Sequence, residues 1–371
     1  MRSAFHVWLN DNLIGYAQDS FTAKEFRITA DTLHTSANVL FVRVYRWCDG
    51  AYFEDQVGLS CNVEHININS LPLPLSPLSP PSRQNLKDFW DMSGIFRTVA
   101  VYSTPKLHVF DYFVRQSFTD NTPTSAKINI ALTLHNYEPE ANHTSIEIEM
   151  LIIEEDRSQQ AMKEEDIREK SVLTLKKKVE IERDQTRLVV NMVGELVTPK
   201  LWSAETPNLY RLFIVLTDEQ SGETIEVLAG RIGIRRIEID RRKGKGQVLL
   251  NGVPIKFKGV NRHEFDQRGG IGVVSKASML QDIFLLKQNN FNAVRTSHYP
   301  NHPLWYHLCD EYGIYLIDET NLETHKLFDH FSTLPSWKKC FLYRAKNLVH
   351  RYLLYHHFRP PPPLHPTIFS P

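Results

Sequence analysis

The stretch Asn292-Ala-Val-Arg295-Thr-Ser-His298-Tyr-Pro300, with Tyr315-Leu-Ile-Asp-Glu-Thr-Asn-Leu-Glu323-Thr-His325 after it, decides the fold. Short apolar runs at 291–295 and 314–318 predict two buried strands, and the spacing of apolar residues over 303–312 predicts a helix between them. Strand, helix and strand in this order predict parallel βαβ units. Charged and imidazole groups follow both strands, where an α/β barrel gathers its catalytic groups.

The residues just before this stretch repeat the pattern. Residues 247–261 predict a β-hairpin and a strand that ends in Asn261-Arg-His263-Glu264, and 275–289 have helical spacing. A lone histidine at a strand end is usually structural, but three successive strands that end this way indicate a functional site. Glu323 and His325 lie two residues apart, so an extended segment points both to one side. This pair suits Mg²⁺ or Mn²⁺, although spacing alone leaves a solvated loop pair as the alternative.

The first two thirds of the chain predict β-structure. Short strand-like runs at 5–10 and 39–47 are separated by turn residues, and alternating runs at 126–134, 145–153, 187–193 and 212–218 predict an immunoglobulin-like sandwich. The charged run 154–178 predicts a long solvated hairpin. A Pro-rich insertion at 57–87 contains Leu71-Pro-Leu-Pro-Leu-Ser-Pro-Leu-Ser-Pro-Pro-Ser82, whose prolines cannot donate to a sheet ladder.

Composition narrows the class of protein. The 371 residues predict two or three domains, and Lys+Arg and Asp+Glu number 43 each, which gives no indication of a nucleic-acid surface. No apolar run approaches the roughly 18 residues of a membrane span, and the N-terminus alternates like a strand rather than like a signal peptide. Four widely separated cysteines predict reduced thiols and a cytoplasmic location.

Residues 259–325 resemble glycoside hydrolase family 2 and, within it, the large bacterial-type β-galactosidases. The resemblance rests on Asn292–Pro300, on Trp305-Tyr306 and Gly313-Ile-Tyr-Leu-Ile, and on the ending Asn321-Leu-Glu-Thr-His. Further matches are Phe5–Asn10, Gly15–Ser20, Arg46–Gly50 and Pro199–Tyr210. The resemblance implies a multidomain β plus α/β architecture with four parts: a partial jelly-roll sugar-binding domain at 1–105 that carries the insertion, an immunoglobulin-like β-sandwich at 106–237, the first three βα units of a TIM (β/α)8 barrel at 238–351, and an unrelated Pro-rich tail at 352–371.

The resemblance also implies roles for individual residues. The family hydrolyses terminal β-galactosides such as lactose with retention of configuration. His263 and His298 are expected to bind sugar hydroxyls, and Arg295 is expected to orient the nucleophilic carboxylate. Glu323 and His325 are expected to bind Mg²⁺. Asp88 is expected to contact both the galactosyl hydroxyls and Na⁺, with a sandwich-edge aspartate as the alternative. Relatives of full length are homo-oligomers, commonly tetramers.

The resemblance stops at Tyr352, before the fourth barrel strand. The acid/base glutamate is expected on that strand and the nucleophile on a later one, so we expect neither in this chain. The resemblance therefore predicts a β-galactosidase-family hydrolase that is incomplete as written. A non-catalytic carbohydrate-binding or complementing fragment is the alternative, and a metal-binding protein is a weaker one. Three parallel strands would leave an open edge, so we expect the part from 238 to 371 to be unstable alone.

Overall fold

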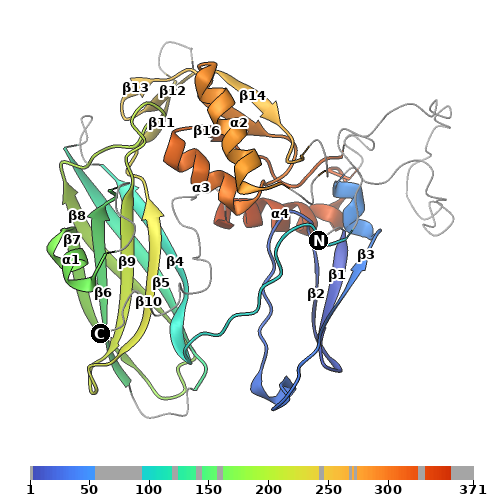
Figure 1. The fold of residues 1–371 in the computed structure, drawn as a ribbon, viewed down its shortest axis with the longest axis vertical. Helices are drawn as coiled ribbons and strands as arrows, with labels where there is room; N and C mark the ends of the chain where they lie inside the picture. The colour runs from blue at the N-terminus through green and yellow to red at the C-terminus, as the bar shows by residue number, and fades with distance from the viewer. Residues whose placement is uncertain are drawn as a thin grey trace.

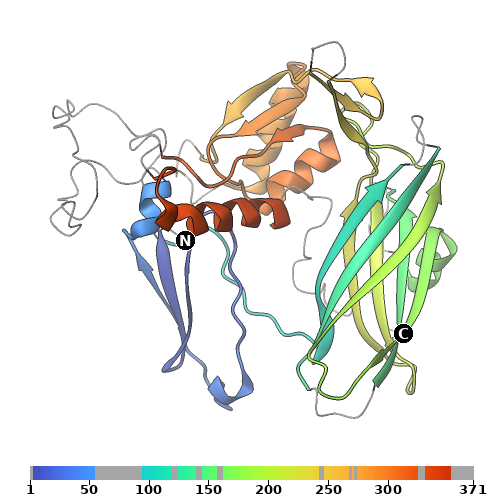
Figure 2. The same cartoon turned by 180° about the vertical axis from the view of Figure 1, so that it is seen from behind.

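A computed structural model describes residues 3–54, 94–118, 124–138, 144–156, 162–241, 246–266, 270, 274–324 and 331–351. It contains a small β-sheet, a larger β-sandwich and a group of βα units (Figure 1). The βα units lie across the ends of both β-structures, as the view from behind also shows (Figure 2). Within the described residues, no helix is both long and apolar enough to cross a membrane.

The first sheet is antiparallel, with strand order β2-β1-β3. Its strands are β1 (Ala4–Leu9), β2 (Asn12–Gln18) and β3 (Leu40–Tyr45), and two short 3-10 helices, η1 (Ala30–Thr32) and η2 (Asp49–Phe53), follow β2 and β3. Phe5, Val7 and Leu9 alternate along β1 and are buried. The important feature for the site is that the ends of β2 and η2 meet the βα units.

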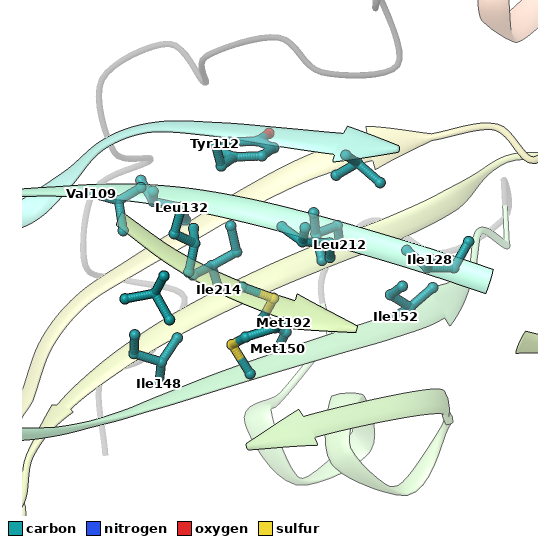
Figure 3. Packing of buried hydrophobic residues seen from close by; sticks show 14 of the residues in the cluster. Val109, Tyr112, Ile128, Leu132, Ile148, Met150, Ile152, Met192, Leu212 and Ile214 are labelled. Carbon is teal, nitrogen blue, oxygen red and sulfur yellow. The ribbon is translucent and has the colours of Figure 1, made fainter. Parts of the chain in front are cut away.

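The sandwich has two antiparallel sheets of order β4-β5-β8 and β10-β9-β6-β7. The first holds β4 (Leu107–Ser117), β5 (Ser125–Asn136) and β8 (Arg187–Val197); the second holds β6 (Thr144–Glu154), β7 (Ser171–Ile181), β9 (Tyr210–Asp218) and β10 (Thr224–Ile232). Alternate residues of β5, including Ile128, Ile130 and Leu132, are fully buried and face Ile148, Met150 and Ile214 across the core (Figure 3). The period-two alternation therefore predicted the sandwich correctly.

The charged segment 154–178 differs from the plain hairpin that its composition predicts. β6 and β7 do pair as antiparallel neighbours, but a short helix, α1 (Glu164–Glu169), interrupts their connection. Ile167 is buried against Leu151, Ile153 and Phe213, so one apolar side chain anchors an otherwise polar helix. The prediction was wrong here because a single anchoring residue is too weak a pattern to stand out among charges.

Glu226 of β10 is a buried carboxyl whose titration should be visible in the stability of the chain. Burial raises its pKa to about 7, although the N–H of Val109 donates to its Oε2 over 2.7 Å. In the native state this carboxyl stays protonated at pH values at which the unfolded chain has already lost the proton. The stabilisation that is present below about pH 4.5 is therefore lost as the pH rises through 7.

Glu226→Gln keeps an acceptor and removes the charge. We expect it to stabilise the sandwich by about 2 kcal/mol at pH 8 and by little at pH 4.5, measured as the difference in melting temperature at the two pH values. Equal differences at both pH values would contradict the assignment.

The third part begins with a small antiparallel sheet and continues into parallel βα units. The small sheet holds β11 (Ile237–Asp240), β12 (Gln247–Leu250) and β13 (Val253–Pro254); the units hold β14 (Gly259–Arg262), α2 (Lys276–Gln288), β15 (Ala293–Thr296), α3 (Pro303–Tyr312), β16 (Tyr315–Ile317), η7 (Pro335–Trp337) and α4 (Lys338–Arg351). Strands β14, β15 and β16 are parallel neighbours in this order, as predicted.

Local sequence signals set the helix boundaries in this part. The Ser275 hydroxyl accepts the Ser278 N–H at the start of α2, and Pro303 opens α3 directly after the capping His302. Gly313 ends α3 with a φ of 72°, and an added Cβ there would lie 2.3 Å from the Ala204 carbonyl oxygen of the sandwich. The helix therefore stops where it meets the sandwich, and β16 begins two residues later.

Candidate functional site

The parallel register of β14, β15 and β16 brings their carboxyl ends to one edge. Arg262 of β14 pairs with Thr296 of β15, and Arg295 pairs with Ile317 of β16. The polar residues that follow each strand therefore meet, as an α/β sheet requires.

The two histidines predicted to bind sugar lie side by side at this edge. The rings of His263, after β14, and His298, after β15, have centroids 5.5 Å apart and an interplanar angle of 67°. Tyr299 lies next to His263, with ring centroids 6.1 Å apart. Two imidazoles side by side can together donate to or accept from neighbouring hydroxyls of one small polyol.

His298 is also the centre of a charged cluster. Its Nδ1 lies 3.0 Å from Oε2 of Glu323 and 3.3 Å from Oε2 of Glu319. Arg295 approaches the same atom, with its Nη2 at 3.3 Å, and its Nε donates to Oε1 of Glu319 over 2.6 Å. A proton on Nδ1 would be donated to a carboxylate, whereas a bare Nδ1 would accept from the guanidinium. The structure thus joins Arg295, His298 and Glu323 of the predicted set.

Glu319 and Asp318 are site residues that sequence reasoning missed. Asp318 accepts from the Thr296 hydroxyl over 2.7 Å and from the Tyr306 hydroxyl over 2.9 Å. Burial nevertheless raises its pKa to about 6. Both acids directly follow the apolar run of β16, and that position at a strand end was the signal that could have identified them.

The segments that follow the strands of the first sheet contact the site through backbone hydrogen bonds and aromatic rings. The Glu323 N–H donates to the carbonyl oxygen of Phe53 over 2.6 Å, and Glu323 forms an isolated parallel bridge with Glu54. Phe21, just after β2, stacks on Tyr299 with ring centroids 3.8 Å apart. A domain far away in the sequence therefore contacts the strand-end edge at Glu323 and at Tyr299.

Two predicted site residues, Asp88 and His325, lie outside the described residues, so their placement stays a prediction. Among the residues that the structure does describe, no group of three His, Cys, Asp or Glu side chains is arranged to hold a metal ion. Glu323 offers one carboxylate, and that carboxylate contacts His298. The described donors alone therefore do not fit a metal centre, and a metal needs ligands beyond them.

The sequence matches three domain descriptions of one family. Residues 1–105 match "Glycosyl hydrolases family 2, sugar binding domain", 107–235 match "Glycosyl hydrolases family 2", and 242–353 match "Glycosyl hydrolases family 2, TIM barrel domain". These matches and the observed sheets confirm the predicted architecture of jelly-roll domain, immunoglobulin-like domain and partial TIM barrel. The domain boundaries drawn from the sequence stay predictions.

Curated relatives and solved structures agree with this family. The chain is 36% identical to a β-galactosidase of Priestia megaterium and to one of Clostridium acetobutylicum, over 95% of this chain and 30% and 33% of those proteins. The chain thus spans about a third of the length of these relatives. A β-glucuronidase of Bacteroides uniformis has the same fold over 95% of this chain and 36% of its own, with a TM-score of 0.69 at 18% identity. A β-glucuronidase of Bifidobacterium dentium gives 0.68 at 22% identity, over 95% of this chain and 53% of its own. The chain belongs to glycosyl hydrolase family 2.

Proposed function

We propose that this chain carries the galactose-binding part of a β-galactosidase active site. The observation that carries the proposal is the meeting of His263, His298, Arg295 and Glu323 at one strand-end edge. Sequence likeness to named β-galactosidases supports galactose as the sugar, whereas the solved neighbours below 25% identity support the fold alone.

The proposed recognition uses hydrogen bonds to sugar hydroxyls. His263 and His298 would bind neighbouring hydroxyls, and Tyr299 would support the ring of His263. A hydrogen bond contributes about 0.5–1.5 kcal/mol, and a buried partner left without one costs about 1–3 kcal/mol, so losing one histidine should weaken binding measurably. Asp88 would add a contact to the galactosyl hydroxyls and to Na⁺.

Hydrolysis with retention needs two carboxyl groups about 5 Å apart, one acid/base and one nucleophile. We propose that neither is supplied by residues 1–351, and that Arg295 acts as a support for the nucleophile. Glu323 and His325 are proposed as two ligands of Mg²⁺ or Mn²⁺, which would supply positive charge beside the acid/base group when bound. Lactose as the natural substrate, a homotetramer and a cytoplasmic location complete the proposal.

A non-catalytic carbohydrate-binding or complementing role is the second candidate. The same strand-end edge supports it, because the histidines bind hydroxyls whether or not a glutamate pair cleaves the bond. Both candidates predict no turnover by residues 1–351, so a turnover assay tests the absence of the catalytic pair, which they share.

The test is incubation of the purified chain with a chromogenic β-galactoside, with Mg²⁺ and with a chelator. We expect no release of the chromophore above background in either condition, because hydrolysis requires two carboxyl groups that, on this proposal, residues 1–351 do not supply. His298→Ala serves as the matched control for any residual rate. Mg²⁺-dependent turnover that His298→Ala abolishes would show that the chain already holds its catalytic pair.

A further inference from the structure

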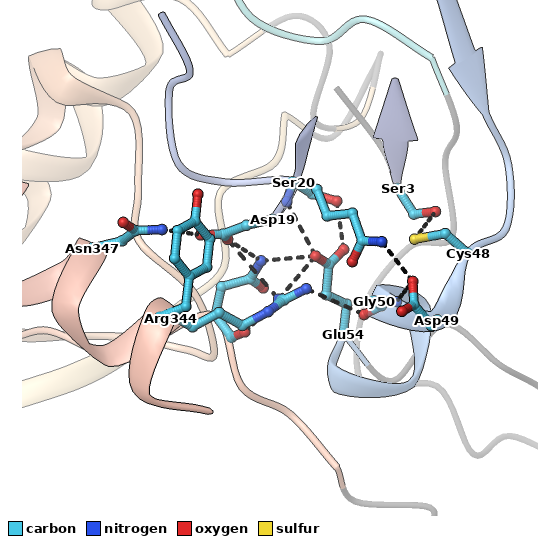
Figure 4. A network of polar contacts seen from close by, with 12 residues as sticks. Ser3, Asp19, Ser20, Cys48, Asp49, Gly50, Glu54, Arg344 and Asn347 are labelled. Atoms are coloured by element: carbon cyan, nitrogen blue, oxygen red, sulfur yellow. Dashed lines mark hydrogen bonds and ion pairs between the residues drawn. The ribbon is translucent and has the colours of Figure 1, made fainter. Parts of the chain in front are cut away.

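A buried ionic cluster joins the first domain to the βα units (Figure 4). It is adjacent to the candidate site, because Glu54 forms an isolated bridge with Glu323. Its centre is Glu54, directly after η2, which is 0% exposed. Its Oε1 accepts the Ser20 N–H over 3.1 Å, the Asn321 amide over 3.0 Å and the Arg344 guanidinium over 3.0 Å. The Ser20 hydroxyl donates to Oε2. The four residues come from four separate segments of the chain.

Arg344 of α4 is the cation of this cluster and is 4% exposed. Besides its ion pair with Glu54, it donates to the carbonyl oxygens of Asn321 over 2.7 Å and Gly50 over 3.3 Å. Its guanidinium lies 5.2 Å from the ring centroid of Phe53. One side chain on α4 therefore holds η2 and the segment after β16 together.

Asp19 supplies the second carboxylate, with 3% of its surface exposed. It accepts from the Asn321 amide over 2.8 Å and the Asn347 amide over 3.1 Å, and Lys24 lies 3.6 Å away. Burial acts to raise the pKa of Asp19, but Arg344 and Lys24 outweigh it and hold that pKa below its usual range. Two carboxylates thus face two cations, and the cluster is neutral.

Such a cluster is a costly way to fill a buried space. Replacing buried ions by apolar side chains of similar volume is often neutral or stabilising, so stability alone does not account for these charges. Charged groups with fixed partners do define one relative arrangement of the segments that carry them. Here the charged groups hold the segment 321–323 in place. The Asn321 side-chain amide donates to both carboxylates, and its carbonyl oxygen accepts from Arg344.

Glu323, two residues after Asn321, belongs to both this segment and the candidate site. Its backbone is held at Phe53, next to Glu54, and its carboxylate reaches His298 at 3.0 Å. Glu54 and Arg344 therefore hold the backbone and side chain of Asn321, and the position of the 321–323 segment determines where the Glu323 carboxylate lies.

We propose that Glu54 is a positioning residue for Glu323 and acts through Arg344 and Asn321, so that the first domain sets the geometry of the strand-end site. The proposal rests on the proposed function only in giving Glu323 a role there. The placement of the segment can be tested without that role.

The test is amide hydrogen exchange of the full chain, read by mass spectrometry on peptides that cover 315–324. Glu54→Gln removes the negative charge of the carboxylate to which Arg344 and Asn321 both donate. We expect amide exchange in 319–324 to accelerate at least tenfold. Exchange in β5 and β6 of the sandwich should stay within twofold, since local opening leaves distant elements unchanged. Ser20→Ala is the matched control, because it removes a donor to Glu54 and leaves Arg344 and Asn321 in place; its 319–324 exchange should also stay within twofold.

Unchanged exchange in 319–324 of Glu54→Gln would overturn the proposal, and so would equal acceleration in all domains, which would indicate general destabilisation. If Glu54→Gln does not fold, Asn321→Ala decides the question. It removes the amide bridge between Asp19 and Glu54 while the ion pair to Arg344 remains. We expect about threefold faster exchange confined to 319–324, and no change there would equally refute the positioning role.

A thio-β-galactoside titration of the same variants adds the link to binding. We expect Glu54→Gln to weaken binding about tenfold and Ser20→Ala to leave it unchanged. If the unmodified chain binds no galactoside, the proposed function fails, and hydrogen exchange still decides whether Glu54 positions Glu323. If galactoside binds equally to both variants while exchange accelerates, Glu54 holds the segment but does not serve the site.

Discussion

Arg97→Met is expected to lower the free energy of unfolding by about 3–5 kcal/mol, because it leaves Glu264 as a buried charge without its cation. Glu264 is 2% exposed, and Nη2 of Arg97 donates to its Oε2 over 2.5 Å. The same guanidinium donates to the carbonyl oxygens of Phe21 over 2.6 Å and Pro300 over 3.0 Å. It therefore joins the first domain to the segments after β14 and β15 at once. Urea unfolding followed by tryptophan fluorescence measures the loss.

The double variant Arg97→Met, Glu264→Met is the control for this prediction. It removes both charges and should recover at least half of the lost stability, since replacing a buried pair by apolar groups is far less costly than breaking it. A loss below about 1 kcal/mol in the single variant would mean that this pair is solvated and does not brace the site.

Trp202→Ala should cost about 3–5 kcal/mol, the usual range for removing a large buried aromatic side chain. Trp202 lies at the sandwich end that meets the βα units and is 1% exposed. Its ring packs against Tyr315 of β16 with centroids 5.7 Å apart, and its Nε1 donates to the Asp310 carbonyl oxygen over 2.8 Å. Arg235 covers its face at 5.1 Å. Thermal melting of the full chain measures the effect.

Trp202→Phe is the milder companion variant. It keeps an aromatic ring in the space but loses the indole donor and part of the buried volume, so we expect a smaller cost than for alanine, about 1–2 kcal/mol. If the alanine and phenylalanine variants melt together with the unmodified chain, the sandwich does not depend on this contact and the two parts are independent.

The strand ends could be predicted from sequence because their signals are local. The apolar runs that became β15 and β16 are bounded by helical spacing, and parallel strands necessarily bring Arg295, His298 and Glu323 to one edge. Alternation with period two predicted the sandwich, and the family resemblance supplied the expected roles of the site residues. The helix α1 was missed because only Ile167 gives its buried face.

The buried ion pairs next to the site could not be predicted from the sequence. Glu54 and Arg344 are 290 positions apart, and Arg97 and Glu264 are 167 apart. Nothing in the periodicity of either segment indicates that a charged residue is buried, because burial of a charge depends on the partner that folding brings to it. Glu319 is different, because it lies two residues after β16, and this position at a strand end is a local signal for a site residue.

The most direct test of the account is a calorimetric titration of the unmodified chain and His298→Ala with a thio-β-galactoside and with the matching thio-β-glucuronide. The account predicts binding of the galactoside alone, weakened at least tenfold in His298→Ala, because we propose the strand-end edge with its two histidines as the binding site and the chain is 36% identical to named β-galactosidases. Binding of the glucuronide in preference, or galactoside binding that His298→Ala leaves unchanged, would contradict it.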